Sequence, residues 1–400
     1  MQRVSRQKER FDVLILETVF WICGWMVFWV YVGYPLSLGV LSRRAQPALA
    51  PESDLPDVTL VVSAFNEADI IREKLLNCVS VDYPKDKFEI IVISDASDDG
   101  TDDVVRQFEQ SGVRLLRQEP RGGKSRGLTR FVPEAAGEII VFSDANSMYE
   151  PQAVRKLVRH FSDPSVGYVV GHQRYFEDET SASSRSERLY WDYEIFLKKC
   201  ESRLGSVVGG DGAIYAIRAG LFTPLRDDDI NDFVNPLQIV LRGYRGVFEP
   251  EAVCYERAAA SFEGEFRRKT RIVTRSLRGL LRVPGVLNPK RVGWFAYEIL
   301  FHKLLRWFVP HFLIVVFAAN LALLGRGELY LFLLGAQLVL YGLAALGATK
   351  KLIAHKIFYI PYYFCLVNVA ALFGTVGVFL GRTYTTWQPE RTRDAARRSR

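Results

Sequence analysis

The chain has 400 residues, of which 49% are hydrophobic and 24% charged, and its net charge is +7. Its basic residues are scattered or lie at the edges of apolar runs, without zinc-finger spacing or an aromatic-basic stripe, so no nucleic-acid partner is expected. The five cysteines form no CxxC pair, which argues against a disulfide framework or a structural zinc site: Cys23, Cys78, Cys200, Cys254 and Cys365.

Apolar runs near both ends predict membrane-spanning helices. The uncharged run 18–41 has about the length of a bilayer, so we expect a transmembrane helix within 12–42 rather than a cleaved signal peptide. Residues 261–307 mix aromatic and charged side chains, which favours amphipathic helices in the membrane interface. We expect three more spans within 308–382 and a basic tail over 383–400; the spans correspond to the runs 308–324, 329–348 and 358–381.

The same spans predict a topology. If the part between the first two spans is cytoplasmic, Lys350, Lys351 and Lys356 also lie in the cytoplasm, as the positive-inside rule asks. Four spans then place both basic termini on the far side of the membrane, which the rule disfavours. The orientation of the N-terminus is therefore left open.

Residues 56–260 alternate predicted strands and helices. The strands are expected at Val58–Ser63, Glu89–Ser94, Val113–Arg117 and Glu138–Ser143, and the helices at Ala68–Val79, Thr101–Gln110 and Ser125–Ala136. This alternation predicts an α/β fold with a mostly parallel sheet and helices on both faces. Ligands in such sheets bind beyond the carboxyl ends of the strands.

Polar side chains follow three of these strands. The first strand is followed by Ala64-Phe65-Asn66-Glu67, the second by Asp95, and the fourth by Asp144-Ala145-Asn146. Helix capping explains any one of them, but not all three together at one sheet edge. Asp95 can accept hydrogen bonds from a base or ribose, and Asp144 with Asn146 can bind Mg²⁺ or Mn²⁺ beside a diphosphate.

A glycine-rich loop precedes the third predicted helix. Arg121-Gly122-Gly123-Lys124-Ser125 is not a Walker A loop, because Gln118 stands where that motif requires glycine. The interpretation left is a loop that places Lys124 on a phosphate at the N-terminus of a helix.

From about Val58 to Arg271 the chain resembles glycosyltransferase family 2, whose members have the GT-A fold. The matching pieces, in order, are the segment Ala64–Ala68, Asp95, the loop with Lys124, the Asp144-Ala145-Asn146 triplet at the DxD position, and Asn231-Asp232-Phe233 with Leu241–Arg245. The resemblance implies nucleotide binding by Ala64, Asn66, Glu67, Asp95, Lys124 and Asp144. It implies metal binding by Asp144 and Asn146, and it makes Asp232 the general base of an inverting transfer.

Two further pieces of the resemblance are less complete. Val208–Gly212 is similar to an acceptor-side glycine turn, which makes Asp211 a site candidate or a turn residue. The stretch Arg268–Ile272 matches the QxxRW motif only at Arg271, which would close over the diphosphate; the alternative for this basic cluster is an interfacial helix that binds anionic lipid. The run 227–229 is interpreted as a solvated acidic loop rather than a source of the base.

The resemblance implies a membrane-bound enzyme of the inner membrane with a cytoplasmic catalytic domain. We expect a UDP-sugar donor, a divalent metal, membrane lipid around the spans, and a saccharide or lipid-linked acceptor in cell-envelope or exopolysaccharide synthesis. Export or polymerisation partners are possible. The alternatives are a polyprenyl-phosphate sugar transferase and an inactive scaffold of an export complex.

Overall fold

The computed structural model describes residues 2–44, 55–175, 182–256, 262–349, 352–353 and 355–386. The predicted tail beyond residue 386 and two of the three loop lysines, Lys350 and Lys351, lie outside the described residues.

In the described part of the chain, eight strands form one mixed sheet in the order β3-β2-β1-β4-β7-β6-β8-β5. They are β1 (Val58–Ala64), β2 (Phe88–Ser94), β3 (Val113–Arg117), β4 (Ile139–Asp144), β5 (Met148–Tyr149), β6 (Val166–Tyr175), β7 (Tyr215–Arg218) and β8 (Arg245–Glu256). The pairs β1–β2, β1–β4, β2–β3 and β6–β8 are parallel, whereas β7 runs antiparallel between β4 and β6. The prediction of a mostly parallel sheet is confirmed.

Helices cover both faces of the sheet because the strands are apolar on both sides. In β1, Leu60 and Val62 pack into one core with Leu75, whereas Val61 packs into a second core with Leu128. The first face carries α3 (Ala68–Val79), α4 (Thr101–Arg106) and α6 (Ala153–Val158). The second carries α5 (Lys124–Phe131), α8 (Asn231–Leu241) and α9 (Phe262–Arg282). Because β1, β2, β3 and β4 run parallel, their carboxyl ends lie at one edge of the sheet.

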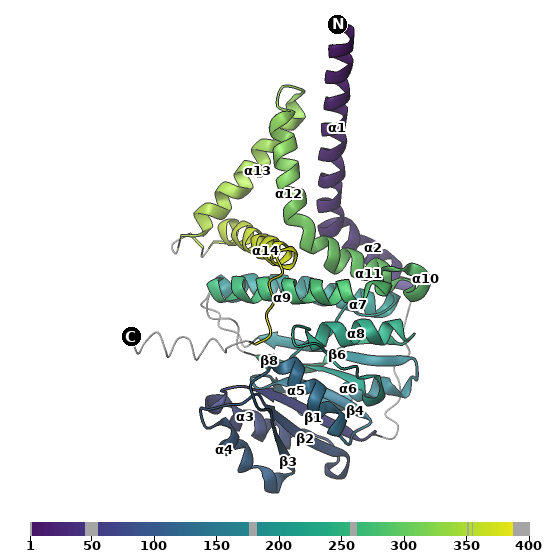
Figure 1. Ribbon diagram of the computed structural model, residues 1–400, viewed down its shortest axis with the longest axis vertical. Coiled ribbons are helices and arrows are strands. Elements are labelled where there is room, and N and C mark those ends of the chain that lie inside the picture. Colours follow the sequence, from purple (N-terminus) through teal and green to yellow (C-terminus); the bar gives the residue numbers. More distant parts are fainter. Residues whose placement is uncertain are drawn as a thin grey trace.

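Four helical stretches are long and apolar enough to cross a membrane: Gln7–Leu41, Phe295–Ala322, Glu328–Gly347 and Lys356–Phe379. They contain all of α1 (Gln2–Phe28) but its first five residues, and also α2 (Tyr34–Leu41), α11 (Phe295–Ile299), α12 (Leu305–Ala322), α13 (Glu328–Gly347) and α14 (Lys356–Phe379). Helices α1 and α12 run away from the sheet, whereas α14 packs alongside α9 (Figure 1).

The chain after α14 returns to the α/β domain. Arg278 in α9 donates to the carbonyl oxygen of Arg382 over 2.5 Å. Further on, the carbonyl oxygen of Thr385 lies where a Cβ on Gly123 would stand. The described chain after α14 thus lies on the α/β domain, and the membrane topology stays a prediction.

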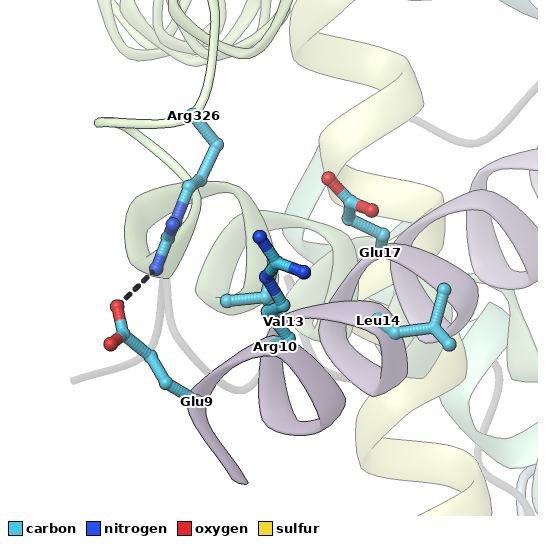
Figure 2. A pocket seen from close by; sticks show the side chains of 6 residues that line it. All are labelled: Glu9, Arg10, Val13, Leu14, Glu17 and Arg326. Atoms are coloured by element: carbon cyan, nitrogen blue, oxygen red, sulfur yellow. Dashed lines mark hydrogen bonds and ion pairs between the residues drawn. The ribbon is translucent and has the colours of Figure 1, made fainter. Parts of the chain in front are cut away.

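A groove lies at the opposite end of the molecule, where α1 begins beside the turn between α12 and α13. Six residues line the groove, as Figure 2 shows: Glu9, Arg10, Val13, Leu14, Glu17 and Arg326. Arg326 and Glu9 form an ion pair of 3.0 Å. None of these residues belongs to the sheet edge, where the chemical groups gather.

Candidate active site at the carboxyl edge of the sheet

Asp144, Lys124 and Asp232 meet at one point of the sheet edge. Lys124, the first residue of α5, places its Nζ 2.5 Å from Oδ1 of Asp144 at the end of β4. A Cβ built on Gly212 would stand 3.4 Å from Oδ2 of Asp232, 3.5 Å from Oδ2 of Asp144 and 3.7 Å from Nζ of Lys124. Two carboxylates and an ammonium group therefore surround the space above a residue without a side chain.

Asp232 lies in the first turn of α8. Burial raises the pKa of Asp232 above its ordinary value, and the carboxylates of Asp211 and Asp144 add to this shift while Lys124 opposes it. A carboxylate with a raised pKa is a stronger base than an exposed one, which suits the removal of a proton from a hydroxyl group.

Asp95 organises the glycine-rich loop. Its two carboxylate oxygens accept hydrogen bonds from the backbone N–H groups of Gly122 (2.8 Å) and Gly123 (2.9 Å). The guanidinium group of Arg121 lies 3.5 Å from the centre of the Phe65 ring, next to the end of β1. Asp95 thus fixes the loop that leads into Lys124, in addition to lying where a nucleotide is expected.

The residues after β1 pack against the loop after β2. Ala64, the last residue of β1, is buried, and its carbonyl oxygen accepts from the N–H of Asp95 (3.0 Å). Asn66 has a left-handed backbone (φ 52°), and its Nδ2 donates a hydrogen bond to Oδ1 of Asp98 (2.7 Å). Glu67 donates its N–H to Oγ1 of Thr101 (2.9 Å). These three predicted residues lie together and shape the ends of β1 and β2.

The turn that carries Asp144 and Asn146 rests on a buried lysine that sequence reasoning missed. Lys74 of α3 is fully buried, and its Nζ donates to Oγ of Ser143 (2.8 Å) and to the carbonyl oxygen of Ser147. The sequence offers no signal for this role, since a lysine in an amphipathic helix is normally exposed. Lys74 thus forms hydrogen bonds to the residues at both ends of the turn, Ser143 and Ser147.

Two residues of the acidic run before Asp232, Asp228 and Asp229, dock on α9, so the interpretation of the run as a solvated loop holds only for the exposed Asp227. Asp228 forms an ion pair with Arg278 (3.2 Å) and another with Arg282, and Asp229 is only 4% exposed. Pairing with these α9 arginines offsets the cost of burying the two carboxylates.

The arginine of α9 that lies near Asp232 is Arg275. It donates to Oγ of Ser125 (3.2 Å) and to the carbonyl oxygen of Asp228 (3.2 Å). Burial lowers the pKa of Arg275, and the carboxylate of Asp232 opposes that shift. The predicted Arg271 lies four residues earlier in α9, and its side chain is half-buried. Arg275 joins the Lys124 loop to the segment before Asp232.

Replacing Gly123 by Ala should weaken binding of the UDP-sugar expected from the sequence by about tenfold or more. Gly123 has φ 88° and ψ 164°, a region that only glycine occupies readily, and a Cβ there would collide with the carbonyl oxygen of Thr385. The loop must then shift away from Asp95. Calorimetric titration of the purified protein with donor checks this.

The control is Gly112→Ala, at a second positive φ (82°) with no atom within 4 Å of the added Cβ. We expect that variant to lose about 1 kcal/mol of stability while binding donor normally. Equal donor affinities for the two variants would contradict the role given to the loop.

Comparisons with known proteins agree with this geometry. Residues 59–219 match the profile of glycosyl transferase family 2. The chain is 28% identical over 233 residues to a probable glycosyltransferase, YdaM, of Bacillus subtilis, covering 54% of each chain. It is 24% identical over 269 residues to a poly-beta-1,6-N-acetyl-D-glucosamine synthase of Staphylococcus aureus, covering 65% of this chain and 64% of that protein. The chain thus spans between about half and two thirds of the length of these relatives.

One solved structure shares the fold over nearly the whole chain. A mannosyltransferase from Pyrobaculum calidifontis, in complex with GDP-Man and Mn²⁺, superimposes with a TM-score of 0.74 at 23% identity, covering 92% of this chain and 99% of that one. Residues 59–219 therefore form a glycosyltransferase family 2 domain, and the chain has the GT-A fold.

Proposed function

We propose that the protein is a membrane-bound inverting glycosyltransferase that takes a sugar from a UDP-sugar and passes it to a saccharide or lipid-linked acceptor in cell-envelope or exopolysaccharide synthesis. The observation that carries the proposal is the meeting of Asp144, Lys124 and Asp232 around Gly212. Lys124 suits a phosphate, Asp144 suits a cation that neutralises the diphosphate, and Asp232 suits an acceptor hydroxyl.

The residues at the sheet edge fit a divalent cation that is shared with the donor. Among the described residues, no group of three or more His, Cys, Asp or Glu side chains could hold a metal by itself. Mg²⁺ is commonly bound by one or two carboxylates together with substrate phosphates, and Asp144 with Asn146 offers such oxygen ligands. When bound, Mg²⁺ or Mn²⁺ neutralises the charge that develops on the leaving diphosphate.

The protein's own groups perform the remaining steps. Asp95 fixes the glycine-rich loop on the nucleotide side, and Lys124 turns from Asp144 to a phosphate oxygen when the donor binds. Asp232 accepts the proton of the acceptor hydroxyl as the oxygen attacks the anomeric carbon. The acceptor oxygen forms its bond on the face opposite the departing diphosphate, so the configuration inverts.

The position of Asp232 favours an acceptor held at a membrane. Its neighbour Phe233 packs edge-to-face on Trp307 of α12, with ring centres 5.8 Å apart. Helix α12 belongs to a stretch that could span a membrane. The base is thus one residue away from a side chain that contacts a candidate span, which supports a lipid-linked or membrane-bound saccharide as acceptor.

Incubation of the full-length protein in lipid vesicles with a panel of UDP-sugars tests the proposal, with GDP-mannose included because the Pyrobaculum neighbour was solved with that nucleotide. Mass spectrometry of the lipid and polymer fractions should show a product larger by one or more sugars. Transfer to polyprenyl phosphate itself would favour the alternative acceptor. Folded protein that neither transfers nor hydrolyses any donor would support an inactive scaffold.

The inner membrane is the proposed location, with the catalytic domain in the cytoplasm. In this arrangement α1, α12 and α13 cross the bilayer, whereas α14 lies on the cytoplasmic face against α9. Single cysteines in a cysteine-free background, probed with an impermeant maleimide on intact cells, should be labelled at position 325 and protected at position 383. Labelling at 383 together with protection at 325 would contradict this topology.

A further inference from the structure

A stripe of charged residues on α7 (Ala182–Leu204) connects two membrane-side helices, α2 and the one that continues into α12, to the turn Val208–Asp211 beside Asp232. Glu194, Lys198 and Glu201 follow one another at intervals of four and three residues, so they lie on one face of the helix. All three side chains are less than 10% exposed. Such buried charges require partners, and the partners are found on both sides of the stripe.

On the membrane side, the partners come from α2 and from the helix that continues into α12. His302 places Nδ1 2.5 Å from Oε1 of Glu201 and Nε2 3.0 Å from Oε2 of Glu194. The hydroxyl group of Tyr34, in α2, donates to Oε1 of Glu201 over 2.6 Å. One carboxylate of α7 therefore joins two helical stretches that could span a membrane.

On the site side, the partners belong to the turn Val208–Asp211. The second oxygen of Glu201 accepts from the N–H of Val208 (3.1 Å), and Nζ of Lys198 lies 3.3 Å from Oδ2 of Asp211. Glu201 and Lys198 thus hold the two ends of the turn.

The Val208–Asp211 turn also contacts the proposed base, Asp232. The N–H of Gly210 donates to the carbonyl oxygen of Asp232, and the next glycine, Gly212, is the residue above which Asp232 and Asp144 meet. A Cβ on Gly210 would stand 2.9 Å from that carbonyl oxygen, so turn and base are in close contact. A displacement of the turn must displace Asp232.

We propose that Glu201 and His302 are positioning residues for the transfer reaction: they fix the Val208–Asp211 turn, and through it Asp232, against the helices α2 and α12. The inference rests on the proposed role of Asp232 as base. It assigns the acceptor half of the site, and not the donor half, to control by the membrane-side helices.

The test compares Glu201→Gln, Glu201→Ala and Tyr34→Phe with the wild type in lipid vesicles. We expect kcat to fall about tenfold in Glu201→Gln and further in Glu201→Ala, because glutamine keeps an oxygen for the N–H of Val208. Donor Kd should stay within about twofold, since the partners of Glu201 among the described residues are Tyr34, Val208 and His302, none of which lies on the donor side. Tyr34→Phe, which removes one hydroxyl group, should fold normally and lower kcat by about threefold.

The matched control is Glu249→Gln. Glu249 is also a buried carboxylate that contacts a histidine, His160 at 2.7 Å, and accepts a backbone N–H, that of Glu251 at 2.9 Å. None of its partners among the described residues lies in the Val208–Asp211 turn. We expect this variant to lower the melting temperature without changing kcat.

The inference is overturned if Glu201→Gln and Tyr34→Phe keep full kcat, or if Glu249→Gln lowers kcat as much as Glu201→Gln does. A loss of donor affinity equal to the loss of kcat in Glu201→Gln would also overturn it. Failure of the proposed function looks different, because the wild type itself would then transfer no sugar.

Discussion

Replacing Asp232 by Asn is expected to lower the rate of transfer by about 10²–10⁴-fold, the usual cost of losing a well-placed general base. Asparagine keeps the shape of the side chain but cannot accept the acceptor proton. Donor affinity should stay within about twofold, because in the proposed mechanism Asp232 acts on the acceptor. Transfer assays stopped at fixed times measure the rate, and calorimetric titration with donor measures the affinity.

The control for this variant is Asp227→Asn, which changes an exposed carboxylate in the segment just before α8. We expect normal transfer from it, since Asp227 lies outside the group around Gly212. If Asp232→Asn keeps more than a few per cent of wild-type transfer, or if Asp227→Asn is the variant that loses it, the base has been assigned to the wrong residue.

Asp144→Ala is expected to remove the metal-dependent part of nucleotide binding. In the wild type, Mn²⁺ should tighten UDP binding by about 10²-fold, because a metal contributes several kcal/mol of charge stabilisation at a diphosphate. The variant loses that ligand and also releases Lys124 from its 2.5 Å ion pair. Metal-free affinity should therefore be unchanged or higher in the variant, which separates this outcome from general damage.

Asn146→Asp is the companion variant. It adds a second carboxylate to the same turn, so metal binding should be kept or become tighter. Equal UDP affinity with and without Mn²⁺ in the wild type would show that Asp144 holds no metal in the donor complex.

Local patterns predicted the first half of the sheet accurately. Helix Ala68–Val79 and strand Val113–Arg117 begin and end where the apolar pattern places them, and β1 extends one residue beyond its expected end. These elements are defined by apolar runs and neighbouring turn residues, both of which act over short distances. The positions of Asp95 and Asp144 at the carboxyl ends of β2 and β4 follow from these strand assignments.

The second half of the domain depends on contacts between distant segments. Strand β7 pairs antiparallel with β4 over more than 70 residues of separation, and no sequence period shows such a partner. The same holds for the ion pairs of Asp228 and Asp229 with α9, and for the return of Thr385 to Gly123. Buried charges such as Lys74 and Glu201 look like surface residues until their partners are known.

The most direct test of the central claim is the stereochemistry of the product. A single carboxylate base and a leaving diphosphate on opposite faces of the sugar allow only one displacement, which inverts the anomeric carbon. Proton NMR of the product formed from an α-linked nucleotide sugar should therefore show a β-linkage. An α-linked product would contradict the account, because retention requires a second displacement or a front-face attack in which Asp232 cannot act as proposed.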